Sequence, residues 1–218
     1  MALRLPPGDC AGTPAKTVLT AGAVLWRVHR RKFAPDSFNR TPIDPDKRGG
    51  GRFDCTSERF YPYLYAAPDE STALAETLLR DLPFDDRGRR LLPRARIAGR
   101  RLSAVELTGD VRLLRLVDST DLAGVCADES LLHAEPLKYD LTRRWACWLH
   151  ERQSWAQGLE WQSKRDLTRR CVMLFGDRFD LLKPLPEAGF DLDEHSLLGR
   201  LNGYLAPYGA HVNPARRS

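Results

Sequence analysis

Short runs of apolar residues, some of them alternating with polar residues, predict several β-strands along the chain. Residues 24–29 alternate, residues 61–67 are rich in aromatic side chains, and residues 171–175 are entirely apolar, as in a buried strand. Two further runs flank the turn signal Thr108-Gly109-Asp110, and they predict a pair of adjacent strands over 102–107 and 111–117.

Helical signals lie between these strands. Pro68 and Asp69 end the second strand and open a predicted helix over 70–82, which Pro83 ends. Asp140 is a credible N-cap for a helix that runs to 153, and a last helix is predicted over 192–205. The apolar side chains of the middle helix fall at helical spacing, which predicts a core stripe rather than a binding surface: Leu141, Trp145, Trp148 and Leu149.

The order of these strands and helices limits the possible fold classes. Strands and helices are mixed without a regular βαβ rhythm, so the predicted class is α+β, with a mixed sheet core and flanking helices. A chain of 218 residues is long enough for one well-cored domain. We expect residues 1–16, rich in proline, glycine and small residues, to form a flexible tail, and residues 17–218 to form the domain. The proline- and glycine-containing segment 33–51 is predicted to be a long, functional loop.

Composition and charge argue against some classes of protein and of binding site. The net charge of +5 and pI near 9.1 fit an anionic substrate or partner, although an arginine-rich proteome would give the same values. No Lys/Arg run interleaves with aromatic residues, so no direct nucleic-acid contact is expected. Five widely spaced cysteines without a CxxC pair argue against a disulfide framework, and the histidines lack metal-ligand spacing, so no metal is expected. Without an apolar stretch long enough to span a membrane, we expect a cytoplasmic protein and no membrane partner.

Three residue types within a short stretch suggest chemistry on a nucleotide. Arg52 follows three glycines, and its planar fork of donors suits phosphate oxygens. Tyr65 lies on the predicted strand 61–67, where its ring could stack on a base or sugar. Glu76 lies in the helix that follows, where a carboxylate could stabilise a cationic sugar. Together they fit an enzyme that breaks the glycosidic bond of a nucleotide.

Each of these residues also has a plain structural explanation. A GGGR segment is commonly only a flexible loop, and neither GxxxxGK[ST] nor GxGxxG occurs in the chain. Glu76 would equally suit a solvated helix face. Ser163, a further candidate, lacks the GxSxG context of a hydrolase nucleophile. The residues taken singly therefore leave the question open.

Their order along the chain is more specific, and it resembles the RES domain family, which is named for its Arg, Glu and Ser. The resemblance runs from about residue 24 to residue 179. Its matching pieces are Leu25-Trp26-Arg27-Val28, Gly51-Arg52-Phe53, Leu64-Tyr65-Ala66-Ala67, Ala73-Leu74-Ala75-Glu76, Gly158-Leu159-Glu160-Trp161-Gln162-Ser163 and the late apolar strand 171–175. One departure is Phe53-Asp54, where the family usually has an aromatic residue followed by Asn.

The resemblance implies a fold similar to ADP-ribosyltransferase toxins and an activity that degrades NAD at the nicotinamide–ribose bond, with water or phosphate as acceptor. NAD would be the substrate, with no separate cofactor. The implied partner is a DNA-binding antitoxin of the Xre helix-turn-helix type that covers the active site of its toxin. On this basis Arg52 and Glu76 are the expected catalytic residues, and Arg27, Tyr65 and Ser163 are the expected NAD-binding residues.

Two alternatives stay open at this point. The same pocket could transfer ADP-ribose to a protein side chain, which would make the chain a mono-ADP-ribosyltransferase. A basic nucleic-acid-binding module would instead use the positive surface, and its affinity would fall steeply with salt.

Overall fold

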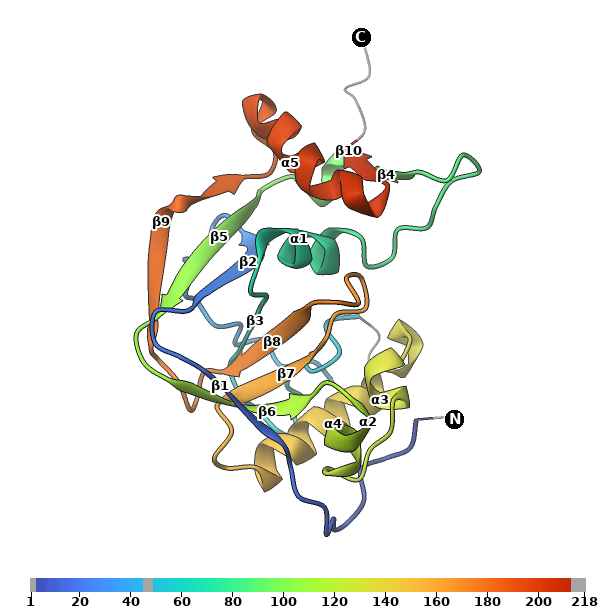
Figure 1. The fold of residues 1–218 in the computed structure, drawn as a ribbon, viewed down its shortest axis with the longest axis vertical. Helices are drawn as coiled ribbons and strands as arrows, with labels where there is room; N and C mark the ends of the chain where they lie inside the picture. Colours follow the sequence, from blue (N-terminus) through green and yellow to red (C-terminus); the bar gives the residue numbers. More distant parts are fainter. Residues whose placement is uncertain (1–2, 45–48, 213–218) are drawn as a thin grey trace.

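The computed structural model describes residues 3–44 and 49–212, and its largest element is a mixed five-stranded sheet (Figure 1). The strand order is β1-β6-β7-β8-β3, with β6 and β7 parallel and the other neighbours antiparallel. The bounds of its strands are β1 Lys16–Leu19, β3 Tyr63–Ala66, β6 Val111–Leu116, β7 Gly158–Gln162 and β8 Arg170–Phe175. The predicted strand over 171–175 is confirmed as β8, which is buried along almost its whole length.

Two smaller sheets complete the strand content. An antiparallel sheet of order β2-β5-β9 comprises β2 Val24–Arg30, β5 Arg100–Leu107 and β9 Leu182–Asp191. A short parallel pair joins β4 Arg90–Leu92 to β10 Ala210–Val212. The main-chain groups of Trp26 and Ala67 exchange two hydrogen bonds, of 2.7 and 2.8 Å, so β2 meets the end of β3 and the two larger sheets are joined there.

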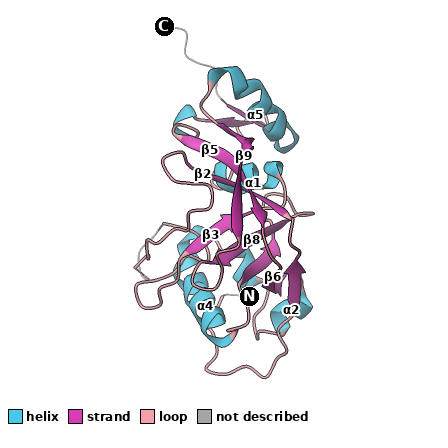
Figure 2. Ribbon diagram, turned by 90° about the vertical axis from the view of Figure 1, so that its left-hand side faces the viewer, coloured by secondary structure: helices cyan, strands magenta, loops and turns pink. Residues whose placement is uncertain are grey.

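The helices form two groups, one toward each end of the molecule, as Figures 1 and 2 show. At one end α1 and α5 pack with β2 and β5 around an apolar cluster that includes Leu74 and Leu201. At the other end α2, α3 and α4 pack on the five-stranded sheet around a second cluster that includes Trp145 and Phe175. Their bounds are α1 Glu70–Leu78, α2 Ser119–Ala123, α3 Ser130–His133, α4 Tyr139–Arg152 and α5 Leu198–Leu205. None of the described helices is long and apolar enough to cross a membrane.

The predicted pairing of strands 102–107 and 111–117 is wrong. Both strands exist, but β5 pairs with β2 and β9, whereas β6 pairs with β1 and β7. The turn at Thr108-Gly109-Asp110 is tied to other segments, because the Thr108 amide donates to the Leu181 carbonyl and the Ala21 amide donates to Asp110. The turn therefore carries the chain from one sheet to the other.

Helix boundaries also differ from the predictions. Helix α1 begins as predicted at Glu70, where the Asp69 carboxylate accepts from the Thr72 amide at 2.8 Å, but it ends at Leu78. The proposed N-cap of α4 is wrong: Asp140 lies inside the first turn, Lys138 holds the cap position, and no side chain caps this end. The buried face of α4 is also broader than its apolar stripe, since it includes Thr142 and Arg143.

The segment before β1 differs from the expected flexible tail. The Arg4 carbonyl accepts from the indole of Trp145 at 2.7 Å, and Leu3 packs on the core beneath. Cys10 forms a disulfide with Cys126, 116 residues away. The argument from cysteine spacing therefore missed one covalent link, although Cys55, Cys147 and Cys171 are free thiols.

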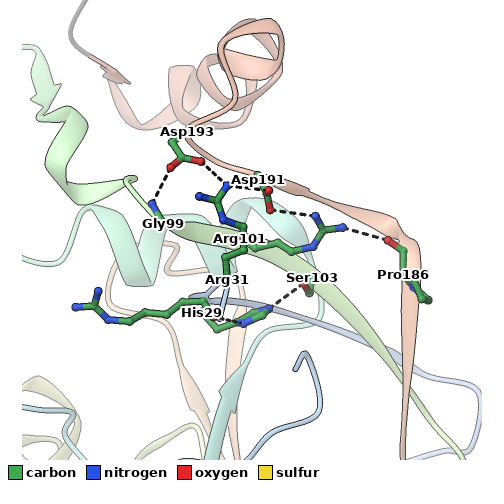
Figure 3. A network of polar contacts seen from close by, with 9 residues as sticks. His29, Arg31, Gly99, Arg101, Ser103, Pro186, Asp191 and Asp193 are labelled. Atoms are coloured by element: carbon green, nitrogen blue, oxygen red, sulfur yellow. Dashed lines mark hydrogen bonds and ion pairs between the residues drawn. The ribbon is translucent and has the colours of Figure 1, made fainter. Parts of the chain in front are cut away.

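An ion-pair network lies on one face of the three-stranded sheet (Figure 3). Arg101 on β5 pairs with Asp191 at 3.0 Å, and Arg31 pairs with both Asp191 and Asp193. Beneath them the buried His29 ring shares a 2.9 Å hydrogen bond with the Ser103 hydroxyl. Burial lowers the pKa of His29 to about 4, with the charge of Arg27 acting in the same direction.

Candidate active site

A cavity of about 390 Å³ lies where β2, β3 and α1 meet the segments around residues 51–54 and 135–139. Four of the five predicted site residues line it, and they come from four separate segments: Arg27, Arg52, Tyr65 and Glu76. The link between Trp26 and Ala67 places β2 beside β3, and the Asp69 cap starts α1 directly after β3. The fold therefore brings these residues together through the crossing of β2, β3 and α1.

Arg52 is buried in the cavity wall, and its side chain is unusual in having no protein partner. Only 7% of the residue is exposed, and its guanidinium makes no hydrogen bond or ion pair within the described part of the chain. The rings of Phe53 and Tyr139 lie 5.7 and 5.9 Å from its central carbon. The main chain is fixed, because the Thr142 hydroxyl donates to the Arg52 carbonyl at 2.6 Å. A buried cation with free donors and a fixed backbone is suited to bind an anion.

One carboxylate oxygen of Glu76 accepts hydrogen bonds from the protein, and the other has no partner in the described part of the chain and is open to a ligand. Its Oε1 atom accepts from the Ser163 hydroxyl at 2.5 Å and from the Arg165 amide at 3.1 Å. Its Oε2 atom has no hydrogen-bond partner among residues 3–44 and 49–212. The side chain is half-buried on the cavity side of α1. This arrangement fixes the carboxylate and leaves one oxygen for a ligand.

Ser163 differs from its predicted role in contacting the substrate. It is 1% exposed and is not among the residues that line the cavity. Its single hydroxyl proton is directed to Glu76, and the oxygen accepts from the amides of Arg165 and Asp166 at 3.1 and 2.9 Å. The structure therefore places Ser163 behind Glu76, where it positions the carboxylate.

Tyr65 lines the cavity and holds the glycine-rich segment through its hydroxyl. The hydroxyl donates to Asp54 at 2.9 Å and accepts from the Phe53 amide at 2.9 Å, while Asp54 also accepts from the Gly51 amide at 2.6 Å. A Cβ at Gly51 would lie 2.7 Å from the tyrosine oxygen, so only glycine allows this approach. Burial, followed by the charge of Asp54, raises the pKa of Tyr65. The phenol therefore stays neutral at ordinary pH.

Arg27 reaches the cavity from β2 and also holds the loop that follows. One terminal nitrogen donates to the carbonyls of Pro35 and Ser37 at 2.9 and 2.8 Å, and Nε is buried without a partner. Burial lowers the pKa of Arg27 to about 10, against the attraction of Asp36, so the side chain remains charged at neutral pH. Its remaining donors are available to an anion in the cavity.

The model of the RES domain family matches residues 24–193. This chain belongs to the RES domain family. A search of curated proteins finds no match.

Among solved structures, this RES domain is similar to the "crystal structure of the M. tuberculosis MbcT-MbcA toxin-antitoxin complex". The TM-score is 0.52 at 13% sequence identity, and the likeness covers 80% of this chain and 86% of that one. At this identity the likeness concerns the fold. It confirms the predicted α+β class and fits the ADP-ribosyltransferase-like arrangement that the family implies.

The RES domain cavity also contains residues that the sequence analysis did not identify. The Tyr139 ring lies 4.8 Å from the guanidinium carbon of Arg80, and the ammonium group of Lys164 is held by the carbonyls of His133 and Ala134. Trp161 meets the edge of Tyr65 at a ring distance of 6.0 Å. Only Asp54 had a visible signal, as a carboxylate three residues after a glycine triplet. Within the described ranges no cluster of His, Cys, Asp or Glu has the form of a metal site.

Proposed function

We propose that this RES domain degrades NAD by cleaving the bond between nicotinamide and ribose. The observation that carries the proposal is the presence of two complementary side chains in the lining of one cavity. Arg52 is a buried cation without a protein partner, and Glu76 is a fixed carboxylate with one open oxygen. A ligand that satisfies both carries an anionic group together with a hydrogen-bond donor or a centre that becomes positive, as NAD does at its pyrophosphate and at its nicotinamide-bearing ribose.

Glu76 acts on the cationic character that develops on the ribose. Cleavage passes through an oxocarbenium-like state, by the same logic as glycoside hydrolysis. Its open oxygen stabilises this charge or holds a ribose hydroxyl, while Ser163 and the Arg165 amide keep the carboxylate in place. Nicotinamide is already a cationic leaving group, so electrostatic placement supplies most of the rate enhancement.

The remaining residues orient the dinucleotide. Arg52 and the free donors of Arg27 bind the pyrophosphate, for which a planar fork of N–H groups is well suited. Tyr65 places its ring against nicotinamide or ribose, since its hydroxyl is occupied by Asp54 and Phe53. Since its proton is directed to Asp54, Tyr65 contributes its ring rather than a proton.

In the cell this activity would be that of a cytoplasmic toxin, silenced by an antitoxin of the Xre helix-turn-helix type that covers the cavity. Membership of the RES family and the likeness to a toxin–antitoxin complex support this role. Co-expression with a candidate helix-turn-helix antitoxin tests it, because a cognate antitoxin must restore growth and stop NAD loss.

The enzymatic proposal is tested by following labelled NAD with the purified protein, with and without phosphate. Loss of NAD with free ADP-ribose as product indicates hydrolysis, and a phosphorylated ADP-ribose that requires phosphate indicates phosphorolysis. Label on a protein band would instead support mono-ADP-ribosyltransfer. If NAD is stable under all conditions, the proposed function is rejected.

A further inference from the structure

Beyond the predicted residues, the cavity is also lined by residues of the three-stranded sheet. Trp26 and Val28, which point to the same face of β2, line it there together with Arg100 on β5. The half-buried indole of Trp26 offers a flat apolar surface of the kind on which nucleobases stack.

Arg100, which lines the cavity, lies beside the exposed Arg30 on the neighbouring strand, and neither has a counter-charge in the described part of the chain. Arg30 and Arg100 are direct partners in the β2–β5 register, an arrangement in which like charges repel. Neither guanidinium has a hydrogen bond or an ion pair in the described part of the structure. Burial lowers the pKa of Arg100, and the charges of Arg30 and Arg96 add to this effect. Arg96 differs from the pair, because it donates to the Leu78 carbonyl at the end of α1.

The neighbouring arginines on the opposite face show the contrast. Arg31 directly follows Arg30 in the sequence, and Arg101 directly follows Arg100. Both Arg31 and Arg101 form ion pairs with Asp191, and Arg31 also pairs with Asp193 (Figure 3). The described chain therefore supplies carboxylates to Arg31 and Arg101 and none to Arg30 and Arg100.

Three of the four acidic residues of the cavity contact other protein groups. Asp54 binds Tyr65, Glu76 binds Ser163, and Glu135 lies 3.6 Å from Lys164. The fourth, Asp81, is exposed and forms no hydrogen bond or ion pair in the described part of the chain. None of the described carboxylates forms an ion pair with Arg30 or Arg100, so a dinucleotide whose pyrophosphate lies on Arg27 and Arg52 leaves this pair without an anion.

We infer that this pair binds a further phosphate on the adenosine ribose, so that the enzyme prefers NADP to NAD. This inference rests on the proposed function and names the substrate within the same cavity. A 2′-phosphate adds a charge of about −2 that two forked donors can bind, and arginine is the residue that accommodates it in dinucleotide sites generally. Trp26 would stack on the adenine next to it.

The test compares kcat/KM for NADP and NAD in the same buffer. We expect the ratio to favour NADP by about tenfold or more, and Arg100→Gln to lower the ratio by about 10- to 100-fold, the effect of losing a charge-assisted hydrogen bond. Arg30→Gln should lower it in the same direction, and because Arg30 is exposed this variant does not threaten folding. Arg101→Gln, the matched control on the paired face, should leave the ratio unchanged.

Two results would overturn the inference while leaving the proposed function intact. One is consumption of NAD without a preference for NADP. The other is a preference for NADP that neither Arg100→Gln nor Arg30→Gln reduces. Failure to consume either dinucleotide would instead reject the proposed function, and the inference with it.

Discussion

Arg52 and Arg143 are both buried arginines near the glycine-rich segment, and they differ in what their donors contact. Arg143 on α4 is fully buried, and its two terminal nitrogens donate to the carbonyls of Asp44 and Gly49, which anchors that segment. Arg52, 7% exposed, lies in the cavity wall and donates to no residue of the described chain. Burial alone therefore does not mark a functional arginine. The informative property is whether the protein itself satisfies its donors.

The same contrast separates the cavity from the scaffold around it. In the scaffold, polar side chains such as Arg178 and Asp121 are bonded to carbonyls, amides and counter-ions. In the cavity, Arg52 and one oxygen of Glu76 are open. We expect substitutions in the scaffold to change the stability of the fold and substitutions in the cavity to change binding or turnover.

The largest expected effect on stability is that of Arg143→Met. Removing the guanidinium leaves two loop carbonyls without their donor in a buried setting, at a cost of about 3 kcal/mol in the free energy of unfolding. For a chain of this size the melting temperature should fall by roughly 6–12 °C. Calorimetry measures it. A melting temperature within 2 °C of the parent protein would mean that Arg143 does not anchor the glycine segment.

Arg52→Met should show the opposite behaviour. Removing a buried cation without a partner should leave the melting temperature within about 2 °C of the parent or raise it. Affinity for NAD should fall by about 10- to 100-fold because the phosphate loses its charge-assisted contacts. Arg52→Lys, which keeps the charge but loses the fork, should give an intermediate loss. Titration calorimetry with NAD measures the affinity of both variants, in a Glu76→Gln background that slows the turnover of NAD. Unchanged affinity would mean that Arg52 does not bind the phosphate.

A scaffold prediction concerns pH. The pKa of His29 is about 4 in the folded protein and near 6.5 in the unfolded chain, so between these values the unfolded chain binds the extra proton. This residue should therefore lower the free energy of unfolding by about 2 kcal/mol as the pH falls from 7 to 4.5. Denaturant titrations of the parent and His29→Gln at both pH values test this. An equal loss in both proteins would contradict it.

The smallest predicted effect separates positioning from binding at Ser163. Ser163→Ala removes one of two hydrogen bonds to the held oxygen of Glu76 and none to the cavity. We expect kcat to fall by about tenfold and KM to stay nearly constant. A rise in KM with kcat unchanged would instead show direct contact with the substrate.

The local elements were predictable because their causes are local. β2 follows from alternation, β8 from an apolar run, and the start of α1 from Asp69. Strand β9 was missed because Pro184 and Pro186 weaken its signal, and it tolerates them as an edge strand. The partners of β5 and β6 depend on contacts with β2, β9 and β1, which no short window of sequence contains.

The site was predictable in part for a different reason. Arg27, Arg52, Tyr65 and Glu76 were identified by their order along the chain, and all four line the cavity. The sequence analysis missed residues that reach the cavity only through the tertiary structure. Tyr139 is one of them, because an aromatic residue at the start of a helix is as typical of core packing as of a binding site. The position of Ser163 depends on the turn after β7, so its role behind Glu76 could not be read from its neighbours in the sequence.

The measurement that tests the central claim most directly is the rate of nicotinamide release from NAD by the parent protein and by Glu76→Gln. Glutamine keeps an oxygen that can accept from Ser163 and Arg165, so the fold should be preserved and only the charge lost. Glu70→Gln, at the start of the same helix, is the matched control. We predict a turnover about 10²- to 10³-fold lower for Glu76→Gln and nearly unchanged for Glu70→Gln, with similar melting temperatures. Equal turnover in the parent protein and Glu76→Gln would contradict the account.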